Sequence, residues 1–134
     1  GARNDAGETW RVGIEKPVRE EGDNDPYTTI LKVVDQSLVT SGLYARYYVV
    51  NDKRYHHIID PVTLFPEDRF LSVSVLTHDS GLADALSTTL YNSTIEEGKA
   101  LIESIPGTEV LWVLMDGQLV RSSGFAALEI EALP

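Results

Sequence analysis

Two helical segments that follow one another without an intervening strand constrain the fold of this chain most strongly. Residues 79–81 are a helix-start signal, and a helix is predicted over 82–91. Ser93, with a glutamate three residues later, has the spacing of a capping box for a second helix over 94–105. Pro106 and the glycine after it end that helix.

Short strand patterns lie on both sides of the predicted helices. The segment 71–76 alternates with period two, which is typical of a half-buried strand. Polar turns at 51–52 and 116–117 join neighbouring patterns into hairpins. Strands are predicted over 10–14, 30–34, 37–39, 46–50, 53–58, 71–76, 110–115, 118–121 and 127–130. This order predicts an α+β fold with a mostly antiparallel sheet and the two helices packed on one face.

Length and charge limit the class of protein. With 134 residues, the chain is predicted to be a single domain over 1–134 with a real core. The net charge of -10 argues against a nucleic-acid or anionic-membrane partner. The absence of cysteine excludes disulfides, thiolate catalysis and cysteine-based metal sites. No apolar run is long enough to span a membrane, and no signal peptide is visible.

A carboxylate and a hydroxyl stand four residues apart in the first predicted helix. Asp84 and Thr88 would share one helix face, and their hard oxygen atoms suit Mg²⁺ beside a phosphate. The small residues Ala83, Ala85 and Ser87 would let a ligand or another backbone approach closely. The alternative is a solvated polar face, with Asp84 in the first turn favoured by the helix dipole. Spacing alone favours this alternative.

Adjacent histidines give a second candidate group. On a strand, the side chains of His56 and His57 point to opposite faces, so they do not form a metal-binding pair. One of them could act as a general base, because the unperturbed pKa of histidine lies near neutrality. A structural or surface histidine is equally compatible, and the spacing does not choose between the two residues.

A polar bend is the third candidate. Thr40, Ser41 and Gly42 interrupt the predicted strand 37–39. They could form a glycine bend whose hydroxyl and amide groups meet a ligand. They could equally form a strand-ending turn, where these residue types are favoured for backbone reasons.

Four motifs occur in a characteristic order along the chain. They are Trp-Arg-Val-Gly-Ile at 10–14, Thr-Ser-Gly-x-Tyr-x-Arg at 40–46, Tyr-His-His-Ile-x-Asp-Pro at 55–61 and Ala-Asp-Ala-Leu-Ser-Thr at 83–88. This order resembles the C-terminal part of the ApbE family, the FAD:protein FMN transferases. The resemblance runs from Trp10 to Phe125, and the third and fourth motifs are its most specific parts.

The resemblance implies a reaction and roles for four residues. Family members bind FAD and Mg²⁺, transfer FMN to a threonine hydroxyl of an acceptor flavoprotein, and release AMP. By this resemblance, Asp84 and Thr88 match metal ligands, and His57 matches a general base. Ile58 matches a position that contacts FAD.

The same resemblance implies further contacts and some departures. Thr40, Ser41 and Gly42 are expected to contact FAD as well. Leu43 replaces an acidic residue that is frequent in the family, and Leu64 replaces a glycine. Both changes are expected to alter a turn or a pocket edge rather than the chemistry.

Family members also have a long N-terminal half, which supplies much of the flavin pocket and a backbone carbonyl to the metal. That half is missing from this chain. We therefore expect the 134-residue chain alone to be inactive or nearly so. Its expected partners are FAD, the acceptor flavoprotein and the N-terminal half, with no nucleic acid.

Two other functions stay open at this point. Water could replace the threonine, which would give an FAD pyrophosphatase that forms FMN and AMP. The chain could also be a non-catalytic domain that binds flavin or a partner. Family members are typically exported, commonly as lipoproteins on the outer side of the cytoplasmic membrane, and the same location is expected here.

Overall fold

An antiparallel sheet of four strands forms the centre of the molecule. The structure is a computed structural model that describes residues 3–42, 47–50, 53–56 and 69–130. The strands lie in the order β3 (Ser37–Gly42), β6 (Phe70–Thr77), β7 (Glu109–Leu114) and β8 (Leu119–Arg121). Every neighbouring pair is antiparallel, as predicted.

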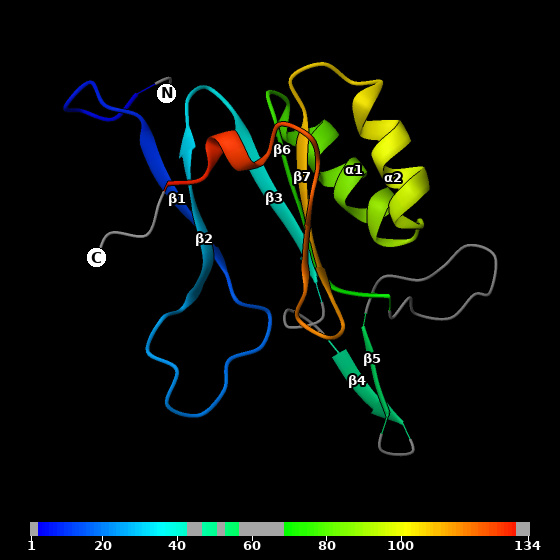
Figure 1. The fold of residues 1–134 in the computed structure, drawn as a ribbon. Coiled ribbons are helices and arrows are strands. Elements are labelled where there is room, and N and C mark those ends of the chain that lie inside the picture. The colour runs from blue at the N-terminus through cyan, green and yellow to red at the C-terminus, as the bar shows by residue number, and fades with distance from the viewer. Residues whose placement is uncertain (1–2, 43–46, 51–52, 57–68, 131–134) are drawn as a thin grey trace.

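Two helices cover one face of this sheet. Helix α1 (Ser80–Tyr91) and helix α2 (Ile95–Glu103) lie on the same side of the sheet (Figure 1). They bury a core against it that includes Val73, Val75, Leu86, Leu90, Val110 and Trp112. The prediction of an α+β fold with both helices on one face is therefore confirmed.

A second, two-stranded sheet covers the opposite face. Strands β1 (Trp10–Glu15) and β2 (Tyr27–Val33) pair antiparallel and form this sheet (Figure 1). A second core lies here, made of Ile14, Leu31, Val33, Leu76, Leu111 and Phe125. Strand β6 is consequently buried along nearly all its length, with even Ser72 and Ser74 buried. The prediction of a half-buried strand at 71–76 was wrong. The alternation between serine and apolar residues suggested one solvent-exposed face, but β1 and β2 cover that face.

Both predicted hairpins are present. Strands β4 (Tyr47–Val50) and β5 (Lys53–His56) pair with each other, with Tyr47 opposite His56. Strands β7 and β8 are joined by a turn in which Gly117 has a φ of 86°, a left-handed conformation that favours glycine.

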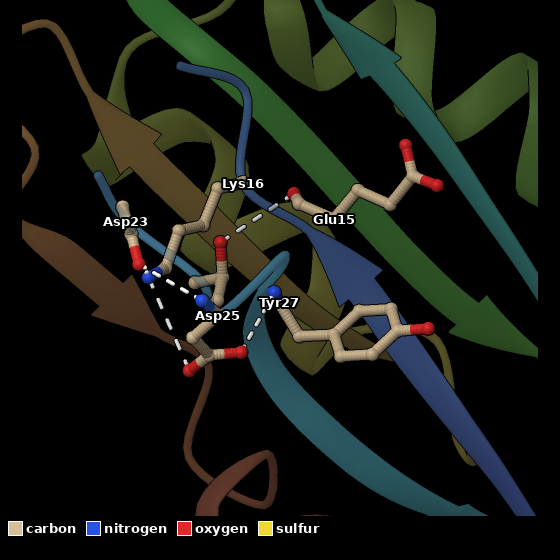
Figure 2. Close-up of polar contacts among 6 residues, drawn as sticks. Glu15, Lys16, Asp23, Asp25 and Tyr27 are labelled. Atoms are coloured by element: carbon tan, nitrogen blue, oxygen red, sulfur yellow. Dashed lines mark hydrogen bonds and ion pairs between the residues drawn. The ribbon is translucent and has the colours of Figure 1, made fainter. Parts of the chain in front are cut away.

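A lysine at the start of the loop between β1 and β2 forms ion pairs with two aspartates near its end (Figure 2). Lys16 Nζ lies 2.7 Å from Asp23 Oδ2 and 4.0 Å from Asp25 Oδ2. Asp25 Oδ1 accepts a hydrogen bond from the Tyr27 amide at 3.1 Å, where β2 begins. The hydrogen bond from Lys16 lowers the pKa of the Asp23 carboxyl.

The two helices begin at side-chain caps. Asp79 Oδ1 accepts from the Leu82 amide at 2.8 Å and starts α1. The capping box of α2 is formed by Thr94 and Glu97, not by Ser93 and the residue three positions later as predicted. The sequence contains two overlapping matches to this motif. Ser93 instead donates its hydroxyl to the carbonyl of Thr89, on the last turn of α1, at 2.7 Å.

The predicted strand at 127–130 was wrong. A short 3₁₀ helix, η1 (Ala126–Leu128), takes its place and is followed by a single bridge between Glu129 and Leu31. The amide of Ile130 donates to the carbonyl of Ile30 at 2.8 Å. The end of the described chain thus pairs with the edge of β2 that does not contact β1, through a single β-bridge. Within the described ranges, no helix has the length and apolar character needed to cross a membrane.

Candidate functional site

The side chains of Asp84 and Thr88 lie on the exposed surface of α1. They are separated by about one turn of the helix, so both face the same side of it. Because α1 begins at Ser80, with Asp79 as its cap, Asp84 is not in the first turn. The sequence-based alternative that gave Asp84 a helix-dipole role there was therefore wrong.

Both side chains are available for a ligand. Among the described residues, neither the Asp84 carboxylate nor the Thr88 hydroxyl has a hydrogen bond or an ion pair. The neighbouring hydroxyls of Ser87 and Thr89 are both bonded to carbonyl oxygens of α1, each at 2.9 Å. The hydroxyls of Ser87 and Thr89 are thus occupied within the helix, and the oxygen atoms of Asp84 and Thr88 face solvent.

The donor set fits part of a magnesium shell. A carboxylate and a hydroxyl supply hard oxygen atoms on one exposed side, as Mg²⁺ requires. The described part of the chain contains no cluster of three or more acidic, histidine or cysteine residues that could hold a metal alone. Water, a ligand phosphate or groups from elsewhere would have to complete the shell.

The small residues of α1 serve the packing of the helix. Ala83 and Ser87 are fully buried, and α1 packs against β3 and β6. Their small side chains therefore allow the helix to pack closely on the sheet. Ala85 is exposed on the same helix. The other buried residues of the helix are Leu86, Leu90 and Tyr91.

The residues Thr40, Ser41 and Gly42 are part of β3. They pair with Ser74, Val73 and Ser72 of β6, so both the bend and the strand-ending turn predicted at 40–42 were wrong. The strand continues because β6 offers a ladder partner for each residue.

Strand geometry separates Thr40 from Ser41. The Thr40 hydroxyl lies 2.7 Å from the Ser74 hydroxyl of β6. The Ser41 hydroxyl lies 2.8 Å from the Ser87 hydroxyl of α1. Because neighbouring side chains of a strand point to opposite faces, only Ser41 of this pair faces the helix that carries Asp84 and Thr88. The structure thus places Ser41 against the buried side of α1, and Asp84 and Thr88 lie on the exposed side of the same helix.

His57 and Ile58 lie outside the described residues, as do Leu43 and Leu64. Strand β5 ends at His56, the residue just before His57. The roles of His57 as a base and of Ile58 as an FAD contact therefore stay predictions.

A hollow on the other side of the molecule was not predicted from the sequence. It has a volume of about 490 Å³ and lies between the β1–β2 loop and the β7–β8 turn. Its lining includes Lys16, Val18, Thr28, Val113, Met115 and Leu119. Among the predicted site residues that the structure describes, none lines it.

Known proteins resemble the chain over most of its length. A model of the ApbE family matches residues 1–112. The chain belongs to the ApbE family. An FAD:protein FMN transferase of Treponema pallidum is 39% identical over 116 residues, which are 86% of this chain and 31% of that protein. A second one, from Klebsiella pneumoniae strain 342, is 34% identical over 115 residues, or 85% of this chain and 35% of that protein.

Solved ApbE structures share the fold. The ApbE protein of Thermotoga maritima is 33% identical, with a TM-score of 0.78 over 92% of this chain and 39% of that one. The flavin transferase ApbE of Vibrio cholerae is 34% identical, with a TM-score of 0.70 over 93% of this chain and 39% of that one. The chain thus spans about a third of the length of the curated ApbE relatives that it matches.

Proposed function

We propose that this chain carries part of the active site of an FAD:protein FMN transferase, which moves FMN from FAD to a threonine hydroxyl of an acceptor flavoprotein. The observation that carries the proposal is the pair of exposed, unpartnered oxygen ligands on α1, Asp84 and Thr88, within the described part of an ApbE chain. Relatives named for this activity match the same stretch of sequence.

Asp84 and Thr88 would hold Mg²⁺ at the pyrophosphate of FAD. When bound, the ion supplies positive charge that neutralises the phosphate oxygens. The chain needs such a local positive charge, because its net charge of -10 would otherwise repel a phosphate ligand.

The remaining residues would bind FAD and move a proton. The oxygen of the acceptor threonine attacks the FMN phosphorus, and the phosphorus–oxygen bond to AMP breaks. His57 would take the proton that the threonine hydroxyl loses. Ile58, with Ser41 and Gly42 at the end of β3, would contact the flavin nucleotide.

The test uses the complete gene product that carries this chain, with FAD, Mg²⁺ and an acceptor flavoprotein. We expect covalent flavin on the acceptor, followed by its in-gel fluorescence, and an equal amount of AMP. His57→Ala should lower the transfer rate by roughly 10²- to 10⁴-fold, since general bases contribute about this much. Asp84→Asn and Thr88→Val should lower the rate and raise the Mg²⁺ concentration needed.

Glu103→Gln is the control, because Glu103 is an exposed carboxylate on α2. It should leave the rate unchanged. Transfer at the parent rate in Asp84→Asn and His57→Ala would contradict the proposal. AMP release without any flavin on the acceptor would show that water is the nucleophile, and would replace transfer by hydrolysis of FAD.

A location on the outer side of the cytoplasmic membrane is also proposed, on the family resemblance alone. Protease treatment of spheroplasts, in which the outer side of the cytoplasmic membrane is accessible, should digest the protein if it is exposed there. Digestion only after cell lysis would contradict this location.

A further inference from the structure

A chain of hydrogen bonds joins the end of β3 to the turn of α1 between Asp84 and Thr88. The hydroxyl oxygens of Ser41 and Ser87 lie 2.8 Å apart. The Ser87 hydroxyl also lies 2.9 Å from the carbonyl oxygen of Asp84, to which it donates. We infer that Ser41 and Ser87 are positioning residues, which hold the Asp84–Thr88 turn at a fixed place beside β3. This inference rests on the proposed function, because that function makes the placement of the turn important.

The atoms involved determine the direction of both hydrogen bonds. A carbonyl oxygen cannot donate, so the single hydroxyl hydrogen of Ser87 points to Asp84. The Ser87 oxygen therefore accepts the hydroxyl hydrogen of Ser41. Ser41 keeps oxygen lone pairs for a further contact, so the FAD contact predicted at this residue is compatible with its positioning role.

Packing alone does not explain a hydroxyl at position 87. The Ser87 side chain is 0% exposed, and its partner is on the neighbouring strand. Ala83, one turn earlier on α1, is buried to the same extent without a polar atom. Burying a hydroxyl costs free energy unless it is hydrogen-bonded. The two hydrogen bonds satisfy Ser87 and also restrain the helix from sliding along the strand.

The hydrogen bonds connect two segments that the sequence assigned to the site. Ser41 is followed by Gly42, the last residue of β3, and Ser87 is followed by Thr88. Asp84 and Thr88 are on one helix, so a shift of that helix would displace both ligands together. Losing a group that orients a metal ligand lowers metal affinity by about 10- to 100-fold.

The test measures metal binding directly in the complete gene product. Mn²⁺ alone is the probe, and free Mn²⁺ is followed by electron paramagnetic resonance during a titration. We expect Ser87→Ala and Ser41→Ala each to raise the Kd for Mn²⁺ by about tenfold. Ser41→Thr keeps a hydroxyl at this half-buried strand position and should restore the parent Kd.

Ser104→Ala is the matched control variant. The Ser104 hydroxyl also donates to a carbonyl three residues earlier, that of Leu101 at 2.6 Å, but on α2. It should leave the Kd unchanged. A purely structural role for the serine pair would lower the Tm of the alanine variants and leave their Kd at the parent value, which would overturn the inference. If Ser87→Ala does not fold, the comparison of Ser41→Ala with Ser41→Thr decides the question.

The same titration of Asp84→Asn separates this inference from the proposed function. If Asp84→Asn loses Mn²⁺ binding while the serine variants bind like the parent, only the positioning role fails. If Asp84→Asn binds Mn²⁺ like the parent, the metal site itself fails, and the positioning role fails with it.

Discussion

Gly98 lets α2 pack directly on the indole ring of Trp112. A Cβ atom at Gly98 would lie 2.8 Å from Trp112 Cζ2 and 3.1 Å from Leu90 Cδ2. Trp112 and Leu90 are both fully buried in the core under the helices, so neither side chain has space to move away. A glycine in the middle of a helix is therefore explained here by the close approach of the helix to the sheet.

We predict that Gly98→Ala lowers the free energy of unfolding by about 1 kcal/mol. Overpacking of a core costs about 1–3 kcal/mol, which exceeds the gain of about 1 kcal/mol in helix propensity. Urea denaturation measures the change. Lys99→Ala, at an exposed position of the same helix, is the control for propensity and should change stability little. A Gly98→Ala protein that is more stable than the parent would contradict the packing explanation.

For single residues, the sequence predicted which residues share a helix face better than it predicted which partners they contact. Asp84 and Thr88 were predicted to share a helix face, and they do. Thr40 and Ser41 were treated as one polar segment, but the strand directs them to different partners, Ser74 and Ser87. That separation depends on pairing with β6, a contact between distant parts of the chain that no local pattern contains.

Among the elements, the hairpin of β7 and β8 is tied to the end of the described chain by an ion pair. Arg121 Nε lies 2.7 Å from Glu129 Oε2, and Arg121 Nη2 lies 3.1 Å from Glu129 Oε1. Partial burial raises the pKa of Glu129, but hydrogen bonds from Arg121 and Thr29 and the charge of Arg121 outweigh it. The pKa of Glu129 therefore lies below its ordinary value of 4.5.

We predict that this pair contributes stability at neutral pH that is lost in acid. Because the folded-state pKa of Glu129 is lowered, the contribution is complete above 4.5 and disappears as the pH falls through the lowered pKa. Glu129→Gln should cost about 0.5–1 kcal/mol at pH 7, since the pair is partly exposed to solvent.

The difference in the free energy of unfolding between the parent and Glu129→Gln should become smaller toward acid pH. Urea denaturation at several pH values measures this difference. Glu21→Gln, at an exposed position in the β1–β2 loop, is the control and should change little at any of them. A loss that is the same at every pH would contradict the ion-pair explanation.

Local chemistry predicted most elements but placed some of their ends incorrectly. The α1 start signal at 79–81 and the turn at 116–117 were correct, because caps and turns are determined by nearby residues. The capping box of α2 was placed one residue too early, since Ser93 and Thr94 both fit the motif. The segment 127–130 was predicted as a strand, but Ala127 and Leu128 belong to a 3₁₀ helix and Glu129 forms only a bridge to β2.

For the whole molecule, the sequence predicted that the helices cover one face of the sheet. In the structure, β1 and β2 also cover the other face. The helices were predicted from their start and capping signals. The packing of β1 and β2 on the other face depends on long-range contacts between elements that are separated in sequence. Length and composition predicted a chain large enough for a real core, but they contain no information on how the strands pair.

We predict that the 134-residue chain alone has little or no transferase activity. It contributes two protein ligands to the proposed metal site, and it spans about a third of the length of its curated relatives. Incubation with FAD, Mg²⁺ and acceptor should give no fluorescent acceptor above a reaction that lacks the chain. The complete gene product is the positive control. Clear flavinylation by the 134-residue chain alone would contradict this prediction.

The short connection between β6 and α1 has a consequence for local opening. Only His78 and Asp79 separate the most deeply covered strand from the helix that presents Asp84 and Thr88. The helix also packs on β3 and β6, so it has little freedom to detach while the central sheet is intact. Amide hydrogens of α1 and β6 should therefore exchange with solvent at similar slow rates, as members of one cooperative unit. The ligand-bearing turn would then retain its shape until the whole domain unfolds.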